Sequence, residues 1–261
     1  MVSRMPVSTG PRFIGVAAAK GGVGQSTISL EWARALAARG RRTLLLEVAG
    51  GDLAWIVGVT PSQFAEDVAE GTVAPAAAVI SAGPNLDLLA TGNEWAVYGC
   101  EDNGRLTNLI EVLISGPWRD CIIDLGHTNP RRARRVWEAC AIIAVIVDDD
   151  LAGVSRSYAM IRHLLDLGWG DRLALVFNHL ADPEQVESLR QRFDQITRAF
   201  LGRTFPLIGV VPDGPAPRRA AAMAKWVPVP EELIQPATDS EHQTDRRTRI
   251  IEAAVLADIK I

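Results

Sequence analysis

The sequence predicts an α/β fold with a mostly parallel central sheet and helices on both of its faces. Apolar runs such as "RTLLLEV" (42–48) and "IIAVIVD" (142–148) are continuous and do not alternate, which is typical of strands buried on both faces. These runs alternate along the chain with segments of helical periodicity. We expect one domain over residues 1–261, with an N-terminal tail at 1–11 and an exposed loop at 227–244.

The order of the elements supports this fold class. The apolar run 12–19 turns at glycines into a helical segment, 26–40, that ends at Gly40. The remaining strands are expected at 42–48, 86–91, 120–126, 142–148, 172–180 and 205–213. The remaining helices are expected at 105–115, 131–141, 155–168, 183–202 and 245–259. The stretch 227–244 is rich in proline and polar residues, so we expect a loop there.

Composition excludes several classes of protein. The 261 residues are 48% hydrophobic and 22% charged, which is typical of a globular protein, and the net charge of -4 argues against a generally basic nucleic-acid binder. The three cysteines (Cys100, Cys121 and Cys140) lie far apart, as expected of buried thiols in a reducing compartment. No signal peptide precedes the first strand, and no apolar run reaches about 18 residues. We therefore expect a cytoplasmic protein, associated with a cell pole or membrane only through partners.

The string "KGGVGQST" (20–27) is the strongest candidate site. It lies between a predicted strand and a predicted helix, where a helix N-terminus can bind an anion. Gly21, Gly22 and Gly24 would let backbone N–H groups converge on a phosphate. Ser26 is placed to offer a hydroxyl to Mg²⁺, and Thr27 follows it in the first helical turn. A chance glycine turn is the alternative, but the eight-residue string in this context favours a phosphate-binding loop.

This string resembles the deviant Walker A loop, KGGxGK[ST]T, of the MinD/ParA group of P-loop NTPases. The resemblance extends over about residues 12–226. It implies a homodimer, ATP or ADP with Mg²⁺ as cofactor, and Lys20 as the signature lysine that reaches the partner's nucleotide. It also implies a set of loop residues that contact the nucleotide: Gly21, Gly22, Val23, Gly24, Gln25, Ser26 and Thr27.

Three later segments resemble the same family. "DCIIDLG" (120–126) looks like the Walker B strand, which would place Asp124 near a metal-bound water. "LVFNHL" (175–180) resembles the strand whose asparagine, here Asn178, recognises the adenine base. "LIGVVPD" (207–213) resembles the segment beside the base and includes Pro212. The resemblance thus implies Lys20 and Asp124 as catalytic residues and Ser26 as the Mg²⁺ ligand.

Two departures from the family pattern affect catalysis. Gln25 stands where the family has the lysine that contacts the β- and γ-phosphates, and an amide cannot neutralise charge. After the next strand the family has D-x-D, whereas this chain has Glu47 and Ala49, and a methyl group cannot orient the attacking water. Asp52 could substitute only through an altered loop. We therefore expect weak nucleotide binding and little or no ATP hydrolysis.

Degenerate sites of this kind occur in the CpaE/TadZ branch, which the "GGDLAWIVGV" segment (50–59) resembles. That resemblance implies a dimeric positioning or assembly factor for a secretion, pilus or division apparatus. An active ParA/MinD-type ATPase that partitions DNA or other cargo is the first alternative. A regulatory module that senses nucleotide without a positional role is the second.

Other features favour structural roles. The arginines of "RRARR" (131–135) are interpreted as a solvated first helical turn. Arg218 and Arg219, beside the predicted base-binding segment, are better candidates for contact with DNA or a partner, but DNA binding is not favoured. The helix at 245–259 resembles a peripheral membrane-targeting helix, but Glu252 and Asp258 favour a packed helix. The four histidines share no ligand spacing, so no zinc site is expected.

Overall fold

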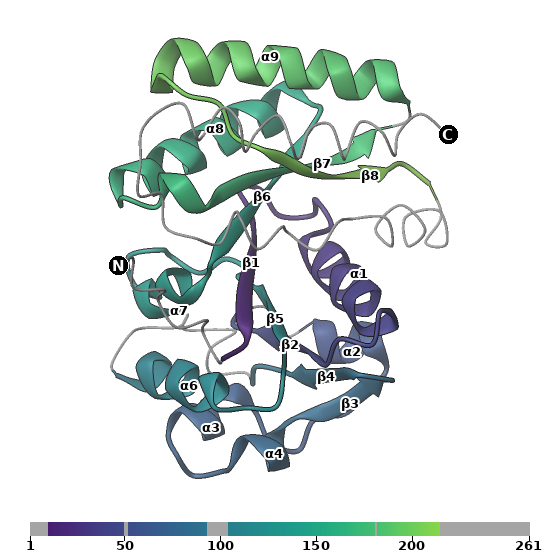
Figure 1. Ribbon diagram of the computed structural model, residues 1–261, viewed down its shortest axis with the longest axis vertical. Helices are drawn as coiled ribbons and strands as arrows, with labels where there is room; N and C mark the ends of the chain where they lie inside the picture. Colours follow the sequence, from purple (N-terminus) through teal and green to yellow (C-terminus); the bar gives the residue numbers. More distant parts are fainter. Residues whose placement is uncertain (1–9, 50–51, 93–103, 181, 215–261) are drawn as a thin grey trace, which may run out of the picture.

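A computed structural model describes residues 10–49, 52–92, 104–180 and 182–214. Within these residues the sheet has eight strands in the order β3-β4-β2-β5-β1-β6-β7-β8. Every neighbouring pair is parallel except β3 and β4 (Figure 1). The strands are β1 Arg12–Ala18, β2 Thr43–Glu47, β3 Ile80–Gly83, β4 Leu86–Leu89, β5 Asp120–Asp124, β6 Ile142–Asp148, β7 Leu173–Leu180 and β8 Leu207–Pro212. The predicted, mostly parallel sheet is confirmed.

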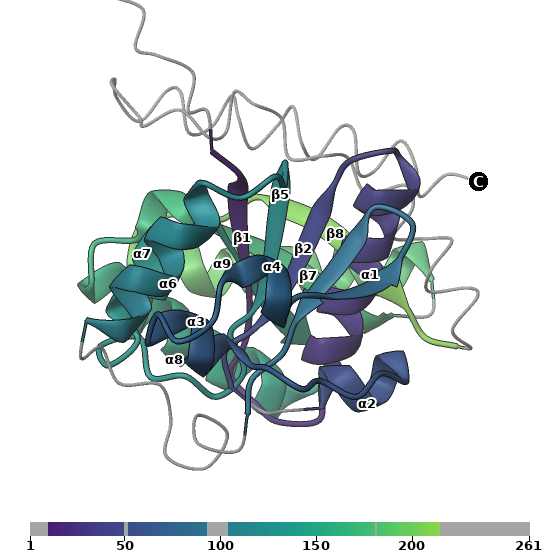
Figure 2. The same cartoon turned by 90° about the horizontal axis from the view of Figure 1, so that it is seen from below.

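Helices cover the sheet on both faces (Figure 2). The helices of the described residues are α1 Gln25–Ala38, α2 Leu53–Val57, α3 Ala65–Ala69, α4 Pro75–Ala78, α6 Arg105–Ile114, α7 Arg134–Ala139, α8 Leu151–Asp166 and α9 Pro183–Leu201. A short 3₁₀ turn spans Gly170–Arg172. Both views show α1 on one side of the sheet and α6 and α7 on the other.

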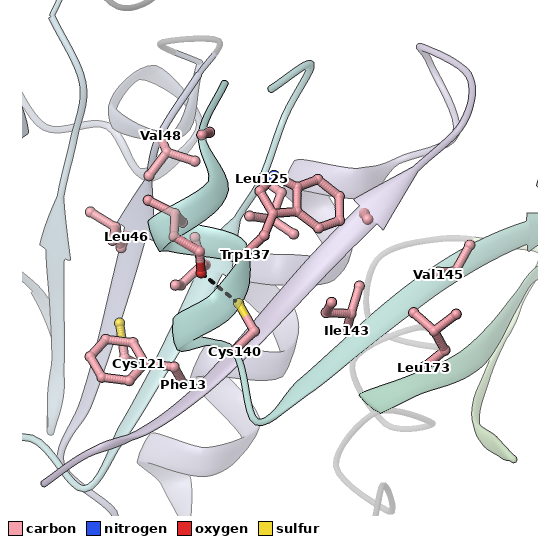
Figure 3. Packing of buried hydrophobic residues seen from close by; sticks show 14 of the residues in the cluster. Phe13, Leu46, Val48, Cys121, Leu125, Trp137, Cys140, Ile143, Val145 and Leu173 are labelled. Carbon is pink, nitrogen blue, oxygen red and sulfur yellow. Dashed lines mark hydrogen bonds between the residues drawn. The ribbon is translucent and has the colours of Figure 1, made fainter. Parts of the chain in front are cut away.

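Two apolar clusters form the core, one on each face of the sheet. The larger cluster joins alternate residues of the central strands to α6, α7, α8 and α9, and it includes Trp137 (Figure 3). The Trp137 ring stacks on that of Trp169, with 6.0 Å between the ring centroids. The smaller cluster joins the other set of strand residues to α1 and α2. Because both faces of each central strand are buried, the strand sequences are continuously apolar rather than alternating.

The two cysteines in the described residues belong to this core. Cys121 and Cys140 are free and fully buried, and Cys140 donates to the carbonyl oxygen of Val136 (Figure 3). Burial raises the pKa of both thiols, that of Cys140 to about 12. They are therefore packing residues, as the sequence predicts. Cys100 lies outside the described residues.

Some element boundaries differ from the sequence prediction. The helix expected at 131–141 begins only at Arg134, because the Asn129 side chain accepts from the backbone N–H groups of Arg131 and Arg132 and holds them in a turn. Conversely, the helix expected from 155 begins at Leu151, where Asp150 caps it by accepting from the Gly153 N–H. Residues 1–9 of the predicted tail (1–11), the loop at 227–244 and the helix at 245–259 lie outside the described residues.

Candidate functional site

The glycine-rich loop between β1 and α1 has the backbone conformation that phosphate binding requires. Gly22 and Gly24 have φ angles of 78° and 76°, which side-chain-bearing residues rarely adopt. Gly24 is also the N-cap of α1, and within the described part of the chain no side chain hydrogen-bonds to this helix start. The first N–H groups of α1 therefore remain available to an anion.

Gln25, the first residue of α1, turns its side chain toward β5. Its Nε2 donates to the Val16 carbonyl oxygen at 2.9 Å and to Asp124 Oδ1 at 2.8 Å. The amide thus joins the ends of β1 and β5, which are neighbours in the sheet. These contacts hold the phosphate loop to Asp124 without supplying a positive charge.

Asp124 is a deeply buried carboxylate at this edge of the sheet, with 1% of its surface exposed. Burial raises its pKa, while hydrogen bonds from Ser26, the Gly126 N–H and Gln25 act in the opposite direction. The structure therefore brings together Gln25, Ser26 and Asp124, which the sequence predicts to share one site. An oxygen-bearing pair such as Ser26 and Asp124 suits a hard cation such as Mg²⁺.

Lys20 forms ion pairs within its own chain. Its Nζ lies 2.7 Å from Asp150 Oδ2 and 3.7 Å from Asp148 Oδ2. The hydrogen bond to Asp150 raises the pKa of Lys20, and the same contact lowers the pKa of Asp150. Asp148 ends β6 and Asp150 follows it, and because β6 lies next to β1 in the sheet, the lysine reaches both carboxylates directly.

Asp148 also contacts His179, at 2.8 Å from the ring Nδ1. His179 has a φ angle of 58°, an uncommon backbone conformation for a residue with a side chain. Lys20, Asp148, Asp150 and His179 thus form a charged cluster beside the loop. Sequence reasoning missed the last three, although three aspartates directly after an apolar strand signal charge at the edge where ligands bind.

Asn178 lies at the carboxyl end of β7 and holds the loop from the other side. Its Nδ2 donates to the Val23 carbonyl oxygen at 2.7 Å, and the residue is 2% exposed. Among the described residues, Asn178 Oδ1 has no hydrogen-bond partner. A buried acceptor without a partner suits a ligand that supplies an N–H donor, such as an adenine amino group. Pro212 ends β8 and lies opposite Leu180 in the neighbouring strand.

Glu47 stands in register with Asp124 but faces a different set of partners. Its carboxylate accepts from the Leu53 N–H at 3.1 Å and from the Thr91 hydroxyl at 3.3 Å. Burial raises the pKa of Glu47, and it is 1% exposed. The Glu47 carboxylate therefore stabilises the chain after β2 through these hydrogen bonds, and its partners are not residues of the phosphate loop.

Ala49 and Asp52 differ in their relation to the site. A Cβ added to Gly126 would lie 2.3 Å from the Ala49 carbonyl oxygen, so the chain after β2 packs closely on the chain after Asp124. Asp52 is exposed and is the residue before α2, where it makes no side-chain cap. Within the described residues, Asp52 makes no side-chain hydrogen bond or ion pair with the loop, so the structure does not support its use as a replacement carboxylate.

Three further observations concern metal-binding clusters, membrane spans and the arginine-rich segment. In the described ranges, no group of three or more histidine, cysteine or acidic residues is arranged to hold a metal ion. Among the helices of the described residues, none combines the length and the apolar character needed to cross a bilayer. The four arginines of 131–135 are exposed. Two of them pair with Glu138, which lies 2.6 Å from Arg134 and 3.8 Å from Arg135.

A parallel sheet with a glycine-rich loop between a central strand and a following helix defines a P-loop nucleotide-binding fold. A family model described as the CobQ/CobB/MinD/ParA nucleotide binding domain matches residues 14–225. The chain therefore belongs to this nucleotide-binding family. The membership agrees with the resemblance noted in the loop sequence.

Individual relatives support the same fold. The antiactivator FleN of Pseudomonas aeruginosa is 26% identical over an alignment of 235 residues that covers 83% of this chain and 79% of FleN. The MinC:MinD cell division protein complex of Aquifex aeolicus matches with a TM-score of 0.62 at 20% identity, over 96% of this chain and 97% of that chain. Cobyrinic acid a,c-diamide synthase of Mycobacterium smegmatis, solved with ADP and magnesium, matches with a TM-score of 0.62 at 22% identity, over 82% of this chain and 91% of that chain.

The buried charge of Glu47 leads to a prediction on stability. Because the folded protein raises the pKa of Glu47, the unfolded chain releases this proton first as the pH rises. The contribution of Glu47 to stability is therefore greatest below the unfolded pKa, about 4.3, and is lost as the pH rises through the folded pKa. Glu47→Gln cannot ionise, so its stability relative to the unaltered protein should increase from about pH 4 to neutral pH.

Urea unfolding at several pH values measures this difference. The control is Glu187→Gln, which alters an exposed carboxylate of α9 that accepts from the Gln191 side chain. A difference for Glu47→Gln that stays constant or decreases with pH would contradict the prediction.

Proposed function

We propose that this chain is a nucleotide-binding regulatory protein with a degenerate ATPase site, which acts as a homodimer on protein partners. The observation that carries the proposal is the Gln25 side chain, which takes the place of the loop lysine and bonds to Asp124 and Val16. The loop keeps its glycine conformations and the free start of α1, so phosphate binding can persist without the lysine charge.

The residues fit an adenine nucleotide with Mg²⁺. The loop residues 21–27 would hold the phosphates, Ser26 and Asp124 would hold the metal and its water, and Asn178 and Pro212 would border the base. The unpartnered Asn178 Oδ1 supports a base with an N–H donor. Mg²⁺ would supply positive charge to the phosphates, and Asp124 would accept hydrogen bonds from its water.

Dimerisation is proposed from Lys20. The family's signature lysine acts on the partner's nucleotide, and here the side chain is held by Asp148 and Asp150 at the edge where a second copy would dock. Nucleotide phosphates from a partner would compete with these carboxylates for the ammonium group. Nucleotide and dimer should therefore stabilise one another.

The cellular role that we favour is positioning or assembly of a secretion, pilus or division apparatus. The "GGDLAWIVGV" segment supports it, since a branch with degenerate sites has this pattern. Fluorescence localisation of the tagged protein tests it, and a uniform distribution in cells that contain such an apparatus would contradict it.

A second role, restraint of a transcriptional activator, is favoured by the similarity to FleN over 83% of this chain. Under this hypothesis the partner is a regulator protein rather than an apparatus. Gene-expression profiling of a deletion strain distinguishes the two roles, because an antiactivator requires increased transcription of a defined set of genes. An active partitioning ATPase is the remaining alternative, and a turnover assay tests it.

We predict that Mg²⁺ and ATP bind with a Kd of about 100 µM, from a loss of about 2–3 kcal/mol relative to a micromolar site. The missing lysine charge near the β- and γ-phosphates is the physical reason. Calorimetry measures the affinity, and sedimentation with and without nucleotide measures the dimer. The control Gly24→Val forces a β-branched side chain to a φ angle of 76° and should abolish binding.

Two results would contradict this prediction. Submicromolar ATP binding would mean that another cation fully replaces the lysine. Absence of binding at millimolar nucleotide would mean that the loop no longer accepts phosphate.

A further inference from the structure

His127 lies directly against the phosphate loop. It is the third residue after Asp124, and its side chain is exposed. A Cβ added to Gly21 would lie 3.6 Å from His127 Cε1 and 4.0 Å from Nε2, which is ordinary van der Waals contact. The imidazole therefore borders the loop on the side where the chain leaves β5.

The order of the strands indicates which part of a bound nucleotide would lie nearest to His127. Asn178, the proposed contact for the base, lies near the end of β7, and the loop follows β1. His127 follows β5, which lies on the opposite side of β1 from β6 and β7. A nucleotide with its base near Asn178 and its phosphates in the loop would extend toward β5. The phosphate farthest from the base would then be nearest to His127.

The charges around the loop leave a role for such a group. Gln25 is neutral, and Lys20 already has Asp148 and Asp150 as partners. Asp124 lies at the end of β5 on the same side of the loop, and although burial raises its pKa, the charge of His127 acts in the opposite direction. An imidazole ring can donate a hydrogen bond when neutral and adds a positive charge when protonated.

We propose that His127 contacts the terminal phosphate of a nucleoside triphosphate bound in the loop and thereby sets the preference for ATP over ADP. The inference rests on the proposed nucleotide binding and assigns to it a residue outside the Walker A string. His127 supplies a donor, and in its protonated form a charge, on the side of the loop that faces away from the base. The histidine thus replaces part of the interaction that Gln25 cannot provide.

The experiment compares ATP and ADP affinities by calorimetry for the unaltered protein and three variants. His127→Ala should weaken ATP binding about fivefold, the size expected for one exposed contact to a charged group, and should leave ADP binding within about twofold. His127→Arg keeps a donor and a charge and should retain the preference for ATP. The control His163→Ala removes a histidine on α8 about 20 Å along the helix from its start and should change neither affinity.

The ratio of the two affinities separates a phosphate contact from a packing role. If His127 only packs on Gly21, then His127→Ala changes ATP and ADP binding equally, and this result overturns the inference. An unchanged ratio together with unchanged affinities also overturns it. If the unaltered protein binds neither nucleotide at millimolar concentration, the proposed function itself fails, and this inference fails with it.

Discussion

Replacing Gln25 by lysine and Ala49 by aspartate in one protein should raise ATP turnover by about 100-fold or more over the unaltered chain. The lysine would restore positive charge at the β- and γ-phosphates, and the aspartate would restore a carboxylate that can orient water. Each substitution alone should have a small effect on turnover. Gln25→Lys should mainly improve nucleotide binding, because a methyl group would remain at position 49.

The structure indicates that both changes can be accommodated. Gln25 Nε2 already donates to Asp124 and to the Val16 carbonyl oxygen, and a lysine ammonium group can donate to the same two acceptors. Ala49 is partly exposed, and its backbone packs against Gly126, two residues after Asp124. A side chain that extends from position 49 would therefore begin beside the candidate metal site.

Phosphate release under saturating Mg²⁺ and ATP measures this prediction. Gln25→Met with Ala49→Asn is the matched control, since it changes the same positions without adding a charge. Turnover by the unaltered protein at about 10⁻² s⁻¹ or faster, the rate of a GTPase with its own arginine, would contradict the degenerate site. Equal turnover of the charged and neutral double variants would contradict the roles given to the introduced ammonium and carboxylate groups.

The central strands and the phosphate loop could be predicted because their signals are local. The continuous apolar runs at 42–48 and 142–148 reflect burial on both faces of a parallel sheet, and the structure has β2 and β6 there. The short helices α2, α3 and α4 could not be predicted in this way. Each has four or five residues, which is too short for helical periodicity to be recognised.

The contacts of the site could be predicted only in part, because they join residues far apart in the sequence. That Gln25 and Asp124 share one site follows from the Walker A and Walker B patterns. The pairing of Lys20 with Asp148 and Asp150 depends on β6 lying beside β1, which the spacing of motifs does not specify. In the sequence, the spacing of the histidines tests only whether His127 could be part of a metal site. Its position against Gly21 depends on the path of the chain after β5, which the sequence pattern does not specify.

The end of the sheet opposite to the site contains a buried carboxylate whose loss should strongly destabilise the fold. Asp120 begins β5, is fully buried, and pairs with Arg12 of β1 at 2.8 Å and with Arg41, which precedes β2. Its carboxylate thus joins three adjacent strands through two guanidinium groups. Burial lowers the pKa of Arg12 and Asp120 raises it, so the carboxylate offsets part of the cost of burying this guanidinium group.

Asp120→Ala should lower the free energy of unfolding by about 3–5 kcal/mol, because it removes the buried carboxylate that both largely buried guanidinium groups contact. For a chain of this size the melting temperature should fall by about 6–20 °C. Thermal and urea unfolding measure both quantities. The matched control replaces all three charges, as Arg12→Met, Asp120→Leu and Arg41→Met, and should be much less destabilising, since it leaves no unpaired charge. A cost below about 1 kcal/mol for Asp120→Ala, the range of surface ion pairs, would show that water compensates the arginines and that the cluster does not fasten these strands.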